Sequence, residues 1–148
     1  MPSLFVPDDV IKAPVVSFTF TGAAGLGAVG QTNPIWTPTG RVELLNGVWA
    51  YVTAPLVGGA GSSVALGFAG NPSMLLGATA FGLLLAGIWW DTTVAVLRDA
   101  SGAISKGHNP PTAISSPVTM NIAGNPITGG SIEFYAYYRP LTPGASLA

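Results

Sequence analysis

One segment decides the fold class: Ile127-Thr-Gly-Gly-Ser-Ile-Glu-Phe-Tyr-Ala-Tyr-Tyr-Arg-Pro-Leu141. From residue 131 onward, successive side chains suit opposite faces of a half-buried β-strand, because side chains alternate along a strand. The expected inner face carries Ile132, Phe134, Ala136 and Tyr138, and the expected outer face carries Ser131, Glu133, Tyr135 and Tyr137. The preceding glycine pair permits a turn, and Pro140 ends the strand because proline lacks an amide donor.

The same alternation recurs along the whole chain. Short alternating runs lie near residues 15–21, 41–53, 64–69, 92–97 and 118–122, separated by Gly, Pro and Asn turns. Roughly eight to ten strands with this spacing predict an all-β fold, an antiparallel β-sandwich of jelly-roll-like type. Asn46-Gly47 is the strongest turn signal, and it predicts a two-residue hairpin between residues 41–45 and 48–53.

The length of 148 residues suits one domain with a single core. Residues 1–13 contain two prolines and an acidic pair without periodicity, which predicts an extended arm. The sandwich domain is expected at residues 14–141, and a loose C-terminal tail at residues 142–148. The first residues lack a basic region followed by a long apolar run, so no secretory signal is expected.

Charge is the most unusual feature of the composition. The chain is 49% hydrophobic and 7% charged, whereas charged residues usually make up about 25% of a protein. Such a chain is expected to cover much of its surface with a partner or with lipid. The five basic residues are scattered, so nucleic acid is not an expected partner. The absence of cysteine excludes disulfides and thiolate metal sites.

The segment 73–90 is uncharged and allows two interpretations. Its seventeen residues from Met74 to Trp90 approach the length of a transmembrane helix. Against insertion stand glycines at 77, 82 and 87 and the charge of Asp91 directly after it. These favour the alternative, in which the segment forms buried strands or a short helix in a core or a subunit interface.

Two motifs resemble catalytic or nucleotide-binding sites only formally. Gly25-Leu-Gly-Ala-Val-Gly30 has dinucleotide-site spacing, but the following prolines prevent the helix that would bind the pyrophosphate. Gly61-Ser-Ser loosely resembles a nucleophile elbow, again without a helix after it. The single histidine, His108, lies in an expected surface loop. Neither a cofactor nor nucleophilic catalysis is therefore expected.

Carboxylates are few and show no metal-ligand spacing, so no metal site is expected. A glycosidase needs only two carboxylates, and Asp91, Asp99 and Glu133 satisfy that count. Glu133, however, is expected on the polar face of its strand, where a carboxylate is usually solvated or paired across the sheet. The chain is expected not to be an enzyme.

The aromatic residues suggest a third possibility, a platform that binds a glycan. It predicts that some of five side chains line a groove, and full burial of all five would exclude it: Trp49, Trp89, Trp90, Tyr135 and Tyr137. The alternative is that these rings pack within the sheet and between subunits.

Several segments together resemble the small β-sandwich virion proteins of tailed bacteriophages, which are often capsid decoration (cement) proteins. They are Gly40-Arg-Val-Glu-Leu-Leu-Asn-Gly-Val-Trp-Ala-Tyr-Val-Thr53, Gly61-Ser-Ser-Val-Ala-Leu-Gly67, Asn71-Pro72 with its leucine-rich continuation, and the closing segment 127–141. The resemblance implies a jelly roll or related sandwich that forms trimers on the outside of an icosahedral head and bridges major capsid subunits. It transfers no catalytic residue.

We therefore expect a non-enzymatic virion structural protein on the outer capsid surface, with the major capsid protein and copies of itself as partners. The alternatives are a glycan-binding or structural module of a phage tail or fibre, and a small membrane-inserted protein. Seven residues are the candidates for a subunit or capsid interface: Leu4, Phe5, Val6, Trp89, Trp90, Tyr135 and Tyr137.

Overall fold

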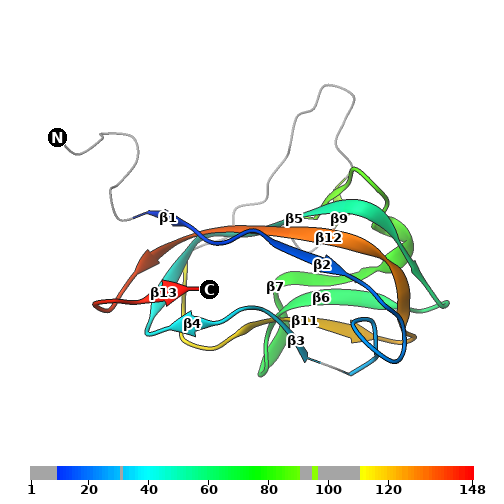
Figure 1. The fold of residues 1–148 in the computed structure, drawn as a ribbon, viewed down its shortest axis with the longest axis horizontal. Coiled ribbons are helices and arrows are strands. Elements are labelled where there is room, and N and C mark those ends of the chain that lie inside the picture. Colours follow the sequence, from blue (N-terminus) through cyan, green and yellow to red (C-terminus); the bar gives the residue numbers. More distant parts are fainter. Residues whose placement is uncertain (1–9, 31, 91–94, 97–110) are drawn as a thin grey trace.

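Two antiparallel sheets pack face to face in the computed structural model, which describes residues 10–30, 32–90, 95–96 and 111–148 (Figure 1). Every strand pair among these residues is antiparallel. The predicted all-β, antiparallel sandwich is thus confirmed, while the jelly-roll order of connections stays a prediction.

The larger sheet contains seven strands within the described residues, in the order β1-β12-β5-β8-β9, with β2 paired to β12 and β10 paired to β5. Their bounds are β1 Ile11–Lys12, β2 Val16–Thr19, β5 Val42–Gly58, β8 Trp89–Trp90, β9 Ala95–Val96, β10 Thr112–Ile114 and β12 Ile127–Pro140. Figure 1 shows β12 and β5 as the two long strands that form the centre of this sheet.

The smaller sheet has the order β3-β11-β6-β7 and faces the larger one (Figure 1). Its strands are β3 Thr32–Trp36, β6 Ser63–Phe68, β7 Asn71–Ala80 and β11 Val118–Ala123. A separate two-stranded pair joins β4 Pro38–Thr39 to β13 Ser146–Leu147, and a 3-10 turn, η1, spans Phe81–Leu83.

The closing strand β12 has the expected alternation. Its predicted inner side chains are all buried: Ile132, Phe134, Ala136 and Tyr138. They face the smaller sheet, where the ring of Trp36 meets that of Phe134 edge to face at 6.5 Å. Burial of one face on both long strands is what holds the two sheets together.

The predicted hairpin at Asn46-Gly47 is wrong. Strand β5 continues through both residues, and its register against β12 passes from Tyr137↔Leu45 to Ala136↔Val48. Two residues of β5 therefore bulge out of the ladder, and Gly47 adopts a φ of 73° there. The glycine conformation expected for a turn serves a bulge instead, because β12 offers a long continuous partner on the far side of it.

The expected loose tail is also wrong at its end. Leu147 of β13 is buried, and the backbones of Thr37 and Ala148 exchange two hydrogen bonds. A similar change affects the expected arm: Ile11 and Lys12 pair with β12 as β1, and Ala13 is buried. The hydrophobic contact of Leu147 and the open edge of β12 supply the energy for ordering these segments.

The uncharged segment 73–90 forms part of β7, the turn η1 and strand β8, so strands and a short helical turn both occur in it, and its residues are partly buried and partly exposed. Leu76 of β7, Leu84 directly after η1 and Trp90 of β8 are buried in the core. Among the described residues, no helix has the length and apolar character needed to cross a lipid bilayer.

Candidate functional site

Five aromatic side chains gather on the outer face of the larger sheet, and we call this group the aromatic face. It consists of Trp49 and Tyr51 of β5, Trp89 of β8, and Tyr135 and Tyr137 of β12. The strand period places them there, since the alternate residues of β5 and β12 fill the core. The core and the aromatic face are therefore two products of one sequence pattern.

The five rings lie on three strands and make contact as a group of three and a separate pair. The ring of Trp89 lies 5.0 Å from that of Tyr51 and 6.0 Å from that of Tyr135, with interplanar angles of 46° and 44°. Farther along the sheet, the rings of Trp49 and Tyr137 meet edge to face at 6.1 Å. Neighbouring rings hold one another upright or tilted, which is the arrangement aromatic quadrupoles favour.

Part of each side chain of the aromatic face remains accessible to solvent. Tyr137 is 42% exposed, and the other four side chains are half-buried. Trp90, also proposed for the interface, is fully buried instead. It follows Trp89 by one residue and so points to the opposite face, where it lies opposite Ala50. The condition that would exclude a glycan platform, burial of all five predicted rings, is thus not met.

One carboxylate and one ammonium lie among the rings. The hydroxyl of Tyr135 donates a hydrogen bond to Oε2 of Glu133 at 2.5 Å, and Nζ of Lys12 lies 5.8 Å from the centre of the Tyr135 ring. This hydrogen bond raises the pKa of Tyr135, and burial and the charge of Glu133 add to it. Glu133 thus lies on the outer face as expected, bonded to a tyrosine of its own strand.

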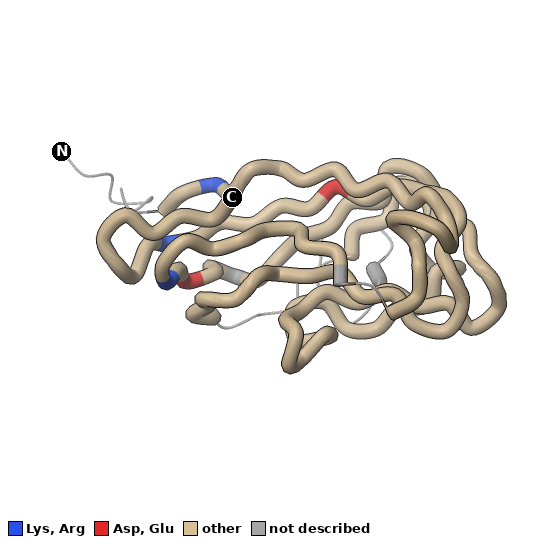
Figure 2. Tube along the Cα trace, turned by 60° about the horizontal axis from the view of Figure 1, so that its bottom comes forward, with Lys and Arg blue, Asp and Glu red and all other residues tan. Residues whose placement is uncertain are grey.

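Other charges are sparse on the described surface. The charged residues in the described ranges are Lys12, Arg41, Glu43, Glu133 and Arg139, and Figure 2 shows that blue and red segments are few along the described part of the trace. Arg139 and Glu43 are cross-strand partners whose side chains approach to 3.6 Å. An exposed pair of this kind contributes about 0–1 kcal/mol.

The Gly-rich loop serves packing. A Cβ on Gly27 would lie 2.0 Å from the carbonyl oxygen of Ile127. The amide of Ile127 donates a hydrogen bond to the carbonyl oxygen of Gly27, so the two backbones are in direct contact. Strand β3, not a helix, follows the loop, as expected from the prolines. In the second formal motif, Ser62 is buried, and its hydroxyl donates to the carbonyl of Gly59 at 2.8 Å. Both motifs are parts of the fold.

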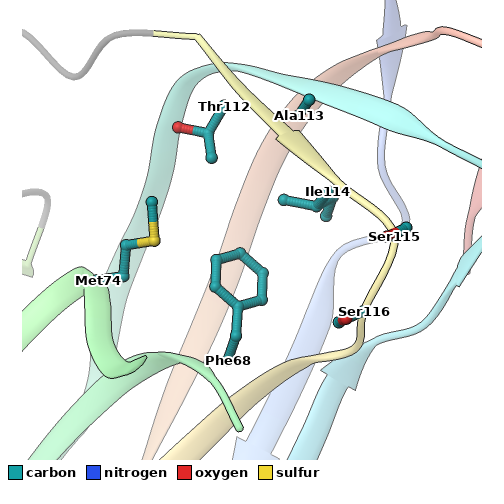
Figure 3. Close-up of a pocket in the computed structure, with 7 residues that line it drawn as sticks. All are labelled: Phe68, Met74, Thr112, Ala113, Ile114, Ser115 and Ser116. Atoms are coloured by element: carbon teal, nitrogen blue, oxygen red, sulfur yellow. The ribbon is translucent and has the colours of Figure 1, made fainter. Parts of the chain in front are cut away.

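A small open pocket of about 220 Å³ lies between β10 with the residues after it and the strands β6 and β7 (Figure 3). Figure 3 shows Phe68, Met74 and Ile114 pointing into it. The remaining described lining residues are Thr112, Ala113, Ser115 and Ser116. None of these seven is titratable, so they offer apolar contact and hydroxyl groups, and no acid or base.

The other sequence candidates lie outside the described residues: Leu4, Phe5, Val6, Asp91, Asp99 and His108. Within the described ranges, no three His, Asp or Glu side chains converge as metal ligands. Sequence reasoning missed Tyr51 and Lys12 as members of the site. Tyr51 was recognisable because it follows Trp49 by two residues, whereas Lys12 reaches Tyr135 only through the pairing of β1 with β12.

Comparison with known proteins gives no relative. No protein-family model, no curated protein and no solved structure matches this chain.

Proposed function

We propose that the chain is a non-enzymatic virion structural protein that decorates and stabilises the outside of a phage capsid. In this role it binds copies of itself as a trimer and binds between major capsid subunits. The observation that carries the proposal is the exterior of the sandwich, which has few charges and several large apolar side chains in contact with solvent.

Three of those side chains form what we call the apolar corner: Val57, Leu83 and Leu85. They are 54%, 55% and 51% exposed. The amide of Leu56 donates to the carbonyl of Leu84 at 3.1 Å, so the backbone next to Val57 lies beside the segment that carries Leu83 and Leu85. Exposed aliphatic side chains are costly in water and favour a protein contact.

The energetic gain from such a contact is substantial. Removing a valine or leucine side chain from water contributes about 1.5–3 kcal/mol. The same contact recurs in every copy on a symmetric shell, so a modest gain per subunit stabilises the whole particle. Few charged groups have to lose their hydration on binding, so little of this gain is offset by desolvation of charge.

Quantitative mass spectrometry of purified particles of the encoding phage tests the proposal. The chain is expected in a ratio near one to the major capsid protein, and its absence from purified particles would overturn the assignment. The triple variant Val57→Ser, Leu83→Ser, Leu85→Ser should lower that ratio, whereas Met74→Ser, at an exposed position of the other sheet, should leave it unchanged.

The aromatic face favours a second candidate, a glycan-binding or structural module of a phage tail or fibre. Flat, partly exposed aromatic surfaces occur where a protein binds a partner with both apolar and polar groups. The same mass-spectrometric measurement separates the two candidates, since a tail component would be present in only a few dozen copies per particle.

A further inference from the structure

We propose that the aromatic face is a binding site for an uncharged polysaccharide chain. Pyranose rings expose C–H groups on their faces and hydroxyls on their edges. A matching protein surface therefore combines aromatic rings with a few hydrogen-bonding groups. On the aromatic face the rings of Trp89 and Tyr135 contact each other, and the rings of Trp49 and Tyr137 form a second contact farther along the sheet.

The spacing suits a chain of repeated units. Tyr135 and Tyr137 are two residues apart on β12, as are Trp49 and Tyr51 on β5, so each pair is separated by about 6.8 Å along its strand. Cross-strand pairing puts Tyr135 opposite Trp49. The rings thus form two parallel rows, along which successive sugar units can each find an aromatic contact.

The polar groups discriminate between a glycan and a peptide. A carboxylate only accepts hydrogen bonds, and it has about four acceptor positions. Among the described residues, the hydroxyl of Tyr135 is the one donor to Glu133. Sugar hydroxyls can donate to the remaining positions. A proline-rich peptide, the other common partner of aromatic surfaces, presents carbonyl acceptors that Glu133 would repel.

The balance of charge favours a neutral polymer. Lys12 and Glu133, on adjacent strands, have opposite charges beside the same ring. An acidic polysaccharide would need an excess of basic side chains here, as other polyanion-binding surfaces have.

This inference deepens the second candidate function by naming the ligand class of the aromatic face, and it does not depend on the proposed capsid role. It uses the aromatic face, whereas the proposed capsid contact uses the apolar corner. Glycan binding is measured on the purified chain without any virus particle. A negative result would leave the capsid ratio unaffected, and a missing capsid association would leave glycan binding intact.

Native affinity electrophoresis of the full chain provides the test, with gels containing hydroxyethyl cellulose, galactomannan or dextran as neutral polymers. Polygalacturonate serves as the acidic comparison. At least one neutral polymer is expected to retard the protein. Trp89→Ala and Tyr137→Ala should each weaken that binding by at least about tenfold, as expected when an aromatic contact is removed. Glu133→Gln should weaken it by about fivefold, since one charged acceptor is lost.

One control variant and one second test variant separate loss of binding from loss of folding. Met74→Ala alters an exposed residue of the smaller sheet and should bind like the parent chain. Tyr137→Ala removes the most exposed of the five rings, so it tests binding even if Trp89→Ala fails to fold by circular dichroism. The proposal is overturned if no neutral polymer retards the protein, if only polygalacturonate does, or if a proline-rich peptide binds the face and the polymers do not.

Discussion

Tyr135 and Glu133 lie two residues apart on one strand and share a hydrogen bond that depends on protonation of the phenol. The bond to Glu133 raises the pKa of Tyr135, and the carboxylate charge opposes formation of a second negative charge beside it. The raised pKa means that the folded chain prefers the neutral phenol. Stability from this contact is thus present below the unfolded pKa of about 10 and is lost as pH rises through the folded value.

An ultraviolet titration of phenolate formation tests this pair. The difference between the parent curve and that of Tyr135→Phe should have a midpoint above about 10. In the Glu133→Gln background the midpoint should fall toward that value, because the carboxylate charge is removed and a neutral amide oxygen accepts a weaker hydrogen bond from the phenol. An unchanged midpoint would contradict an effect of the Glu133 charge on the pKa of Tyr135.

Gly124 and Gly61 illustrate two different physical reasons for a glycine, a positive φ and a lack of space for a side chain. Both have a positive φ, 81° and 83°, but a Cβ on Gly124 would lie 2.1 Å from the carbonyl oxygen of Gly61, whereas a Cβ on Gly61 meets no atom within 4 Å. Gly61→Ala should cost about 1–2 kcal/mol of unfolding free energy for the left-handed backbone. Gly124→Ala should cost clearly more, because the backbone must also move. Urea unfolding of both variants measures the difference. Equal losses of unfolding free energy would contradict the predicted steric clash at Gly124.

At the scale of the element, β5 remains one strand paired with β12 although Asn46-Gly47 locally favours a turn. The bulge adds two residues, so the alternation of faces is the same on both sides of it: Leu44 and Val48 are both buried. A turn signal acts on four residues, whereas the pairing with β12 acts along the whole length of the strand. The longer interaction determines the outcome.

Deleting residues 46 and 47 together is therefore expected to preserve the fold. Leu45 and Val48 would then pair with consecutive residues of β12, and unfolding free energy should change by no more than about 2 kcal/mol. Deleting Gly47 alone should be far more damaging, since a shift by one residue exchanges the two faces of the strand. Thermal unfolding followed by circular dichroism compares the two variants. If these residues formed a hairpin turn, the double deletion would lower the unfolding free energy more than deletion of Gly47 alone.

At the scale of the whole molecule, the low charge governs how the protein associates. Its exposed groups are mainly apolar or hydroxyl-bearing, and the described Arg139–Glu43 pair spans two strands of one sheet. Contacts made by such a surface depend on removal of apolar area from water, which salt does not screen.

The self-association that we propose should accordingly respond little to ionic strength. We expect the dissociation constant to change less than about twofold between about 50 and about 500 mM NaCl, because only charge–charge contacts are screened over this range. Sedimentation equilibrium at both salt concentrations gives the value. A weakening of tenfold or more would instead indicate ion pairs in the contact.

The sequence by itself determined the all-β class, the two faces of β12 and the low charge of the surface, because alternation and composition are local properties of the chain. It also indicated that Tyr135 and Tyr137 point outward together. Only the tertiary structure decided that Asn46-Gly47 forms a bulge, that Trp90 enters the core, and that the C-terminal end pairs with β4. Each of these depends on a partner strand distant in sequence, whose hydrogen bonds and buried area outweigh the local preference.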